Sequence, residues 1–240
     1  MSHPFFRQVQ SKKVSDFILE QLEEAIILKE FLSNEQLPSE RELAAAFNCS
    51  RLALREALST LETQGLIEKR LGAKGGTFVL PVTQRSNTRT KEDIESSWQD
   101  LLEIFEYRLM VEPEAARLAA DRILPRDLQQ LEQLLHQSQS ESIMREEFRS
   151  IDVKFHLLIG AASQNAYIAN AIRKIRTSIN PALDLMPYSD EVKLNTINHH
   201  KQLVEAFIKK DSRLAKETMY AHISGTSLAI AKRISQQNHL

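Results

Sequence analysis

Hydrophobic and polar positions between residues 37 and 79 predict two short helices followed by a hairpin. Ser39 can cap the first helix, and Glu42, three residues further on, completes a capping box. Ser50 can cap the second helix, and Gly65 stands where helices commonly end in the left-handed conformation. The apolar positions of the second helix recur at helical spacing and predict one buried face, made of Leu54, Ala57, Leu58 and Leu61.

Two short runs of alternating apolar and polar residues follow this second helix. They cover residues 66–71 and 77–80, with Gly72, Gly75 and Gly76 between them, which predicts a β-hairpin. The short turn between the helices lies at Asn48-Cys49. Helix, turn, helix and hairpin together predict a winged helix-turn-helix, whose usual ligand is DNA.

The second helix carries two arginines near its N-terminal end. Arg51 and Arg55 are four residues apart and therefore share one helical face. The N-terminal part of a recognition helix enters the major groove, where a guanidinium can bind a guanine edge or neutralise a phosphate. The alternative interpretation is two solvated arginines on a surface helix. Agreement among all parts of the motif favours DNA recognition.

The hydrophobic pattern of the remaining chain predicts helices. We expect a winged domain over residues 1–82, a polar linker over 83–93 and an all-helical domain over 94–240. An amphipathic helix over residues 14–32 would complete the winged domain. Its inward positions are expected to be Val14, Phe17, Ile18, Leu22, Ala25 and Ile26.

Six helices are predicted in the C-terminal part, and their short connections favour an antiparallel bundle. Pro113 predicts a break or kink in the first of them, and the later breaks are expected at Asn165, Pro181, Pro187 and Asp211. The fold class is therefore mainly α, with a small hairpin wing. The predicted helices cover residues 94–120, a segment opened by Pro125, and residues 143–162, 165–180, 189–210 and 212–235.

Four potential metal ligands occur in this helical part. Asp152 and His156 are four residues apart and point from one helical face, while His200 and His222 lie in the last two helices. Three imidazoles and one carboxylate suit a divalent borderline metal such as zinc, nickel, manganese or iron. A helical histidine is more often a hydrogen-bonded core or surface residue, and His199 competes with its neighbour for the ligand position.

Arg108 stands in an otherwise apolar stretch, FEYRLMVEP, which predicts that its guanidinium points into the bundle. A buried guanidinium needs an anionic partner. An internal ion pair with Glu112, four residues on, with Glu103 or with Glu106 would satisfy it, and so would an anionic ligand.

The formal net charge of −1 gives no overall sign of a polyanionic partner. Between residues 51 and 91, however, eight Lys/Arg stand against three acids, where phosphates would lie. No apolar run of about 18 residues predicts a membrane span. Cys49 is the single cysteine, so no internal disulfide can form, and we expect a cytoplasmic protein without a membrane partner.

Several motifs resemble the GntR family of bacterial transcription regulators: LPSERELAAAF, the SRxxxREAL pattern over Ser50–Leu58, LETQGLIEKR and GGTFV. The C-terminal part, with IFEYRLMVEPEAARLAA, is similar to the FadR-like branch, which joins the winged domain to an all-helical effector domain called FCD. The matching residues there are Asp152–His156, His200–Phe207 and the late His222. The resemblance covers nearly the whole chain.

This resemblance implies a homodimer that binds a pseudo-palindromic double-stranded DNA operator and senses a small metabolite in the helical domain. One departure is Leu52-Ala53, where the family often has a hydroxyl residue and a proline or serine. The departure places one phosphate contact in question. The DNA-binding residues implied by the resemblance are Arg41, Ser50, Arg51 and Arg55, with Lys74, Gly75 and Gly76 at the wing tip.

Many members of the branch hold a metal with one Asp and three His, which correspond here to Asp152, His156, His200 and His222. Their effector is often a small carboxylate that completes the coordination, and Arg108 would bind its negative charge. We therefore expect a ligand-responsive repressor and not an enzyme. The alternatives are a metal-dependent hydrolase fused to a DNA-binding module and a DNA-binding architectural protein without a ligand.

Overall fold

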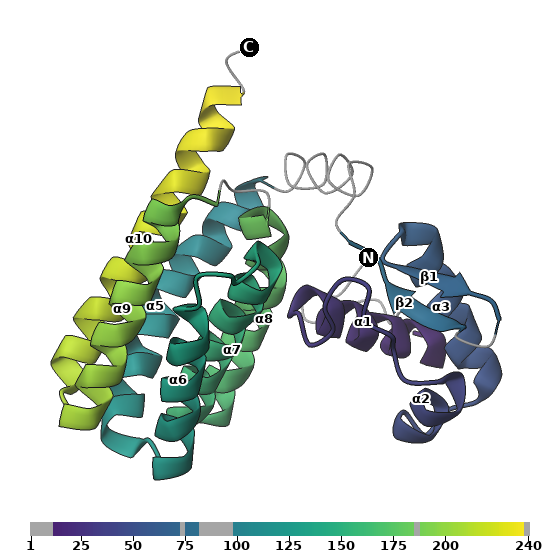
Figure 1. Cartoon of the computed structure of the whole chain (residues 1–240), viewed down its shortest axis with the longest axis horizontal. Coiled ribbons are helices and arrows are strands. Elements are labelled where there is room, and N and C mark those ends of the chain that lie inside the picture. Colours follow the sequence, from purple (N-terminus) through teal and green to yellow (C-terminus); the bar gives the residue numbers. More distant parts are fainter. Residues whose placement is uncertain (1–11, 73–74, 82–97, 185–187, 238–240) are drawn as a thin grey trace, which may run out of the picture. The chain divides into compact units, whose positions relative to one another are not determined.

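The computed structural model describes residues 12–72, 75–81, 98–184 and 188–237. These residues form two compact units (Figure 1). The winged unit contains described residues 12–26 and 33–81, and the bundle unit contains 27–32 and those from 98 onward. Among the described residues, no helix is long and apolar enough to cross a membrane.

The winged unit forms from helices whose ends are set by local side chains. Ser39 and Glu42 form the predicted capping box, the Ser50 hydroxyl accepts from the Ala53 N–H at 3.2 Å, and Gly65 adopts φ 76°. The predicted buried face of the second motif helix is confirmed. The elements are α1 (Val14–Ile27), α2 (Glu40–Ala46), α3 (Arg51–Gln64), β1 (Ile67–Arg70) and β2 (Gly76–Val79).

The wing is an antiparallel hairpin, as predicted. Its register pairs Ile67 with Val79 and Arg70 with Gly76. Gln36 pairs with Phe78 of β2, and its Nε2 donates to the Gly75 carbonyl at 3.3 Å. A Cβ on Gly76 would come within 2.2 Å of Gln36 Nε2, and its φ is 159°. The close approach of Gln36 therefore accounts for a glycine at this position.

The buried face of α1 differs from the prediction. Val14 and Phe17 are 58% and 50% exposed, so the expectation that they point inward was wrong. The buried positions are instead Ser15, Ile18 and Leu22. Successive residues of a helix point about 100° apart, so Val14 and Phe17, which precede the buried Ser15 and Ile18, point away from the packed face. The unit is small, so α1 buries only a narrow stripe.

Helix α1 also ends five residues earlier than predicted, at Ile27 instead of Leu32. No glycine or proline in this stretch marks the end. Lys29 takes a left-handed φ of 56°, and two carbonyls leave the helical pattern for side chains of the bundle unit. Asn180 Nδ2 donates to the Ile27 carbonyl at 3.2 Å, and Ser150 Oγ donates to the Lys29 carbonyl at 3.2 Å. Contacts distant in sequence thus end this helix.

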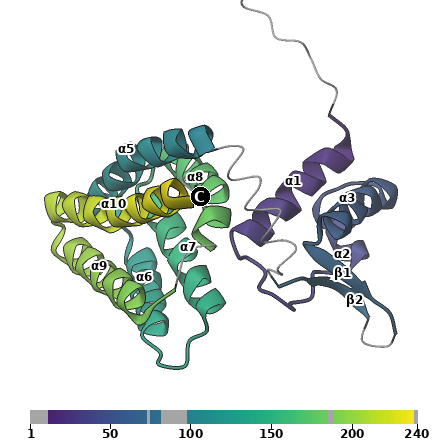
Figure 2. The ribbon, with the colours of Figure 1, turned by 90° about the horizontal axis from the view of Figure 1, so that it is seen from above.

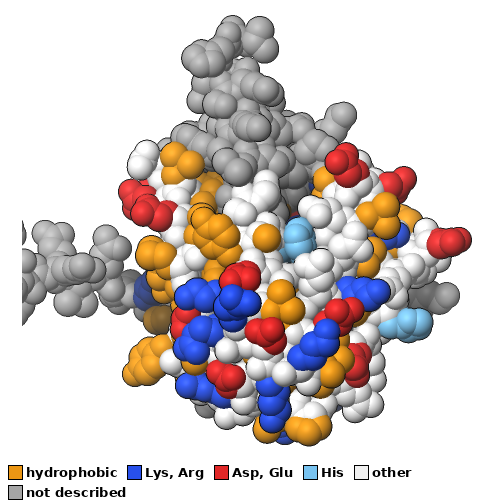
Figure 3. Space-filling view, turned by 90° about the vertical axis from the view of Figure 1, so that its left-hand side faces the viewer, with side chains coloured by type: hydrophobic (Ala, Val, Ile, Leu, Met, Phe, Trp, Pro, Cys, Tyr) orange, Lys and Arg blue, Asp and Glu red, His pale blue; other side chains and the backbone are white. Residues whose placement is uncertain are grey.

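The bundle unit consists of the six predicted helices (Figures 1 and 2). Helix α5 packs against α10, α8, α7 and α9, and α6 packs against α7 and α9. Figure 3 shows acidic and basic side chains intermingled with hydrophobic ones on one face of this unit. The helices are α5 (Trp98–Arg122), α6 (Pro125–Ser138), α7 (Arg145–Ala162), α8 (Ala166–Asp184), α9 (Asp190–Lys209) and α10 (Ser212–Gln237).

Two predicted interruptions do not occur. Helix α5 continues through Pro113 to Arg122, and α8 continues through Pro181 to Asp184. Burial of the residues after each proline holds the helix together despite the lost N–H donor. The breaks at Asn165 and Asp211 are confirmed, and Pro187 lies outside the described residues. The buried residues after the prolines are Ala115, Ala116, Ala119 and Ala120 in α5 and Ala182 and Leu183 in α8.

Candidate metal centre, ligand cavity and DNA interface

The arginines predicted to bind DNA are exposed on the winged unit. Arg41 lies in α2, and Arg51 and Arg55 lie in the first turns of α3. Arg55 Nε donates to Glu40 Oε2 at 2.8 Å, so a neighbouring carboxylate already holds this guanidinium. A phosphate would have to replace that carboxylate. Exposed ion pairs of this kind are weak, which makes the exchange inexpensive.

The other predicted DNA-binding residues have structural roles or fall outside the described chain. The Ser50 hydroxyl caps α3. Gly75 leaves no room for a side chain, because a Cβ there would lie 2.6 Å from the Arg70 carbonyl oxygen. Gly76 faces Gln36 in the same way. Lys74 lies outside the described residues.

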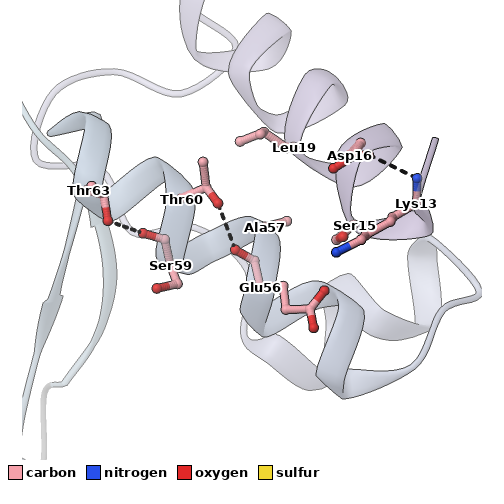
Figure 4. Close-up of a pocket in the computed structure, with 9 residues that line it drawn as sticks. All are labelled: Lys13, Ser15, Asp16, Leu19, Glu56, Ala57, Ser59, Thr60 and Thr63. Atoms are coloured by element: carbon pink, nitrogen blue, oxygen red, sulfur yellow. Dashed lines mark hydrogen bonds between the residues drawn. The ribbon is translucent and has the colours of Figure 1, made fainter. Parts of the chain in front are cut away.

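A groove of about 470 Å³ lies between α1 and α3 in the winged unit (Figure 4). Two of its hydroxyl groups are paired locally: Thr60 Oγ1 donates to the Glu56 carbonyl at 3.1 Å, and Thr63 Oγ1 donates to the Ser59 carbonyl at 2.9 Å. Asp16 caps the start of α1 by accepting from the Lys13 N–H at 2.9 Å. None of the residues that line the groove has a buried side-chain N or O atom without a hydrogen-bond partner among the described residues, so the groove gives no sign of a ligand.

The four predicted metal ligands come together inside the bundle. Asp152 and His156 project from α7, His200 from α9 and His222 from α10. All four side chains are buried, and one ligand atom of each lies within 4.8 Å of all the others. His200 belongs to this group, and its neighbour His199 does not. The i, i+4 spacing on α7 and the antiparallel neighbours α9 and α10 produce this convergence.

Distances among the ligand atoms suit a tetrahedral or octahedral cation. Asp152 Oδ1 lies 3.6 Å from the Nε2 atoms of His156 and His200 and 3.9 Å from that of His222. His156 Nε2 and His222 Nε2 are 3.1 Å apart. Metal–ligand bonds of about 2.0–2.2 Å place tetrahedral ligand atoms about 3.3–3.6 Å from one another. His200 Nε2 is buried without a hydrogen-bond partner among the described residues, and a cation would satisfy it.

Electrostatics hold Asp152, His200 and His222 in the protonation states that a cation requires. Burial lowers the pKa of His200 to about 3, and burial together with the neighbouring imidazoles lowers the pKa of His222 well below its ordinary value. Burial alone would raise the pKa of Asp152, but the Arg176 charge and the His156 contact hold it well below its ordinary value. Neutral imidazoles and an ionised carboxylate are the ligand forms that bind metal.

Glu112 on α5 orients one of the histidines. Its Oε2 accepts a hydrogen bond from His156 Nδ1, which leaves His156 Nε2 to face the other ligands. Its Oε1 accepts from Arg108 Nε at 2.7 Å, and both side chains are fully buried. The predicted internal ion pair of Arg108 with Glu112 therefore exists. Metal-bound histidines commonly donate their second ring nitrogen to a carboxylate in this manner.

The sequence interpretation missed three residues next to Asp152. Arg176 Nη2 donates to Asp152 Oδ2 at 2.6 Å, and Arg149 Nη1 donates to the same oxygen at 3.1 Å. Tyr188 lines the adjoining cavity. Arg176 had a detectable signal, because it shares an apolar face of α8 with Ile172 and is fully buried, as Arg108 is on α5. Arg149 and Tyr188 had none.

A cavity of about 70 Å³ adjoins the four ligands within the bundle unit. Its lining includes Arg108, Arg149, Arg176, Asp152 and His222. The site thus combines a candidate metal centre with an electropositive cavity. Such an arrangement can bind a small anion.

The chain matches two family models. Residues 14–79 match "Bacterial regulatory proteins, gntR family", and residues 103–225 match "FCD domain". The Uxu operon transcriptional regulator of Escherichia coli strain K12 is 30% identical over 209 residues, which cover 84% of this chain and 80% of the relative. The chain belongs to the GntR family.

Other relatives of this GntR-family regulator agree with that assignment. The Exu regulon transcriptional regulator of Escherichia coli strain K12 is 28% identical and covers 89% of this chain and 83% of its own. The repressor NanR of Cronobacter sakazakii is 26% identical, with 91% and 85% covered. E. coli McbR/YncC shares the fold, with a TM-score of 0.55 at 19% identity, covering 93% of this chain and all of that one. The chain is therefore a transcriptional regulator, and the hydrolase alternative is not retained.

Glu112→Gln in this GntR-family regulator is expected to weaken zinc binding about 10–100-fold, because a neutral amide polarises His156 less than a carboxylate does. The measurement is competition with a chromophoric zinc chelator. Glu114→Gln is the matched control, since Glu114 lies two residues further on the same helix and pairs with Arg117 and Lys216 at the surface. Unchanged zinc affinity in a folded Glu112→Gln protein would contradict the assigned role.

Proposed function

We propose that this chain is a metal-containing, effector-responsive repressor that binds a pseudo-palindromic operator as a homodimer. Asp152, His156, His200 and His222 hold the divalent cation. A small organic acid is the effector, and it binds beside the cation. The observation that carries this proposal is the buried convergence of these four ligands next to a guanidinium-lined cavity.

The donor set favours zinc, with nickel, manganese and iron as the other candidates. Imidazole suits zinc, nickel and iron, whereas manganese prefers carboxylate and water oxygens. Four-coordinate sites with nitrogen and oxygen ligands are typical of zinc. Three histidines and one aspartate whose ligand atoms all lie within 4.8 Å of one another are compatible with four ligand positions around one ion. A bound cation supplies a Lewis-acidic position for an effector oxygen.

Arg108 is proposed to bind the effector carboxylate. Its Nε is held by Glu112, while its Nη1 is buried without a hydrogen-bond partner among the described residues. The ion pair fixes the guanidinium and leaves one donor for a ligand. A buried donor without an acceptor costs roughly 1–3 kcal/mol, which an anionic ligand recovers.

The winged unit is proposed to bind DNA through Arg41, Arg51 and Arg55, with the wing tip at Lys74, Gly75 and Gly76. Exposure of the three arginines on α2 and α3 supports this role. A homodimer would present two recognition helices to half-sites about one helical turn apart. Relatives named for a regulon or an operon support regulation at a defined operator.

Selection of binding sites from a random double-stranded DNA library tests this function. Zinc-loaded protein is expected to enrich an inverted repeat, and multi-angle light scattering is expected to give the mass of a dimer. Small organic acids are then added to the complex with the selected DNA. Failure to enrich any sequence at moderate salt, or enrichment with no acid that alters binding, would contradict the proposal.

A chain of ion pairs connects the cavity with the segment that follows α1. Arg149 contacts Asp152 and also donates from Nε to Asp184 Oδ1 at 3.2 Å. Asp184 Oδ2 lies 2.9 Å from Lys29 Nζ. Lys29 belongs to segment 27–32, which is part of the bundle unit and covalently continues α1. We propose that this segment, together with the linker, transmits the state of the cavity.

Lys29→Met is expected to reduce the effect of the acid on DNA affinity by at least about 3-fold, because the ion pair between Lys29 and Asp184 is lost. Zinc affinity and DNA affinity without the acid should stay within about 2-fold of wild type. Lys12→Met is the control, since Lys12 pairs with Glu20 at the surface. Fluorescence anisotropy with labelled operator measures the effect, and an undiminished response in Lys29→Met would exclude this route.

A further inference from the structure

Four guanidinium groups line the cavity beside the candidate metal centre, and one of them belongs to an exposed residue, Arg145. The other three come from different helices. Arg108 comes from α5, Arg149 from α7 and Arg176 from α8. Arg108 and Arg176 are fully buried, and the Arg149 side chain is 14% exposed. Buried like charges repel one another strongly, so an assembly of this kind indicates an anionic ligand in addition to the internal carboxylates.

Each of the three guanidiniums is only partly satisfied. One nitrogen of Arg108 contacts Glu112, one of Arg176 contacts Asp152, and Arg149 contacts both Asp152 and Asp184. Other donor atoms are buried without a hydrogen-bond partner among the described residues. These atoms are Arg108 Nη1, Arg149 Nη2, Arg176 Nε and Nη1, and the Tyr188 hydroxyl.

These donors exceed what one metal-bound carboxylate can accept. Such a carboxylate has two oxygens, and the one on the cation has little capacity left. Charge leads to the same conclusion. Three guanidiniums and a divalent cation face the carboxylates of Asp152 and Glu112, while Asp184 is balanced by Lys29. Three positive charges remain before the exposed Arg145 is counted, and a monocarboxylate removes only one of them.

The Asp152 carboxylate locates a second anionic position. Its Oδ1 faces the three histidine nitrogens, whereas its Oδ2 receives Arg149 and Arg176. The Asp152 carboxylate group therefore separates the guanidiniums of Arg149 and Arg176 from the candidate metal position. Tyr188 lines the same cavity, and its ring packs on Phe148 at 5.6 Å between centroids.

We propose that the effector is a short dicarboxylate of three or four carbons. One carboxylate binds at the cation beside Arg108, and the other binds Arg149, Arg176 and the Tyr188 hydroxyl. One or two carbons between the carboxylates span the short separation set by Asp152. The cavity of about 70 Å³ has room for roughly five to seven water-sized groups, which suits a short acid.

The inference rests on the proposed function, since it assumes that an acid binds beside the cation. Isothermal titration calorimetry with the zinc-loaded full chain compares malonate with acetate and succinate with propionate, at equal ionic strength. Zinc content is measured again after each titration to exclude removal of the metal. At least one diacid is expected to bind about 10-fold or more tightly than its monoacid partner, because charge-assisted hydrogen bonds form at the second position.

Two variants separate the second position from the first. Tyr188→Phe is expected to reduce diacid affinity to that of the monoacid and to leave monoacid affinity within about 3-fold. Arg149→Gln, which also loses the hydrogen bond to Asp152, is expected to lower diacid affinity more than monoacid affinity. Arg213→Gln, an exposed arginine on α10, is the control. Equal affinity for diacid and monoacid, or an equal loss of affinity for both in the variants, would overturn the dicarboxylate assignment. The proposal of an organic-acid effector would remain. Binding of neither class to zinc-loaded protein would overturn the organic-acid effector as well.

Discussion

His200→Ala is expected to abolish stoichiometric zinc binding by a chain whose wild type holds about one zinc ion. The substitution removes one of four buried ligands and leaves Asp152 facing only two imidazoles. The loss should exceed the roughly 10–100-fold expected from an outer-shell change such as Glu112→Gln. Inductively coupled plasma mass spectrometry after desalting measures the metal.

Thermal unfolding gives a second, independent measure of the same site. Zinc at 100 times its dissociation constant stabilises the native wild type by about 2.7 kcal/mol, or about 5–10 °C in Tm. His200→Ala should show no such increase. His136→Ala is the matched control, because His136 lies at the exposed end of α6. Equal zinc content and an equal Tm increase in His200→Ala would show that the cation does not bind there.

Arg51→Ala is expected to remove most sequence-specific DNA binding. Arg51 is exposed at the first position of α3, where a recognition helix enters the major groove. A bidentate contact with guanine contributes about 1–3 kcal/mol, or about 5–150-fold for each recognition helix. Anisotropy with the selected operator and with a scrambled duplex measures the loss.

Salt dependence distinguishes the two contacts that Arg51 could make. Loss of a guanine contact lowers operator affinity while binding to the scrambled duplex changes little. Loss of a phosphate contact in both subunits of the proposed dimer weakens both duplexes and reduces the salt slope by about 2. Arg213→Ala removes the same charge from the bundle unit and should change neither affinity. Operator binding equal to wild type in Arg51→Ala would contradict recognition by α3.

Local signals in the sequence were sufficient for much of the fold. The capping box of Ser39 and Glu42, the Ser50 cap and Gly65 depend on neighbouring residues, and all occur in the structure. The wing and the six bundle helices follow equally local patterns. The break predicted at Pro113 does not occur, because packing of the residues after it outweighs the local cost of the proline.

Residues of the site could be predicted from the sequence only where helical spacing places them on one face. Asp152 and His156 share a face by spacing, and the family resemblance supplied His200 and His222 as partners. Arg149, Arg176 and Tyr188 were missed, because three separate segments meet there only in the folded bundle. The early end of α1 has the same origin, since Asn180 and Ser150 bind its last carbonyls. Long-range contacts leave little trace in local sequence patterns.

The most direct test of the account measures operator affinity with and without malonate or succinate in three samples: zinc-loaded wild type, zinc-free wild type and His200→Ala. We expect the diacid to weaken operator binding at least about 5-fold in the zinc-loaded wild type and to have no effect in the other two. An equal response in all three samples, or none in the zinc-loaded wild type, would contradict control of DNA binding through the metal centre.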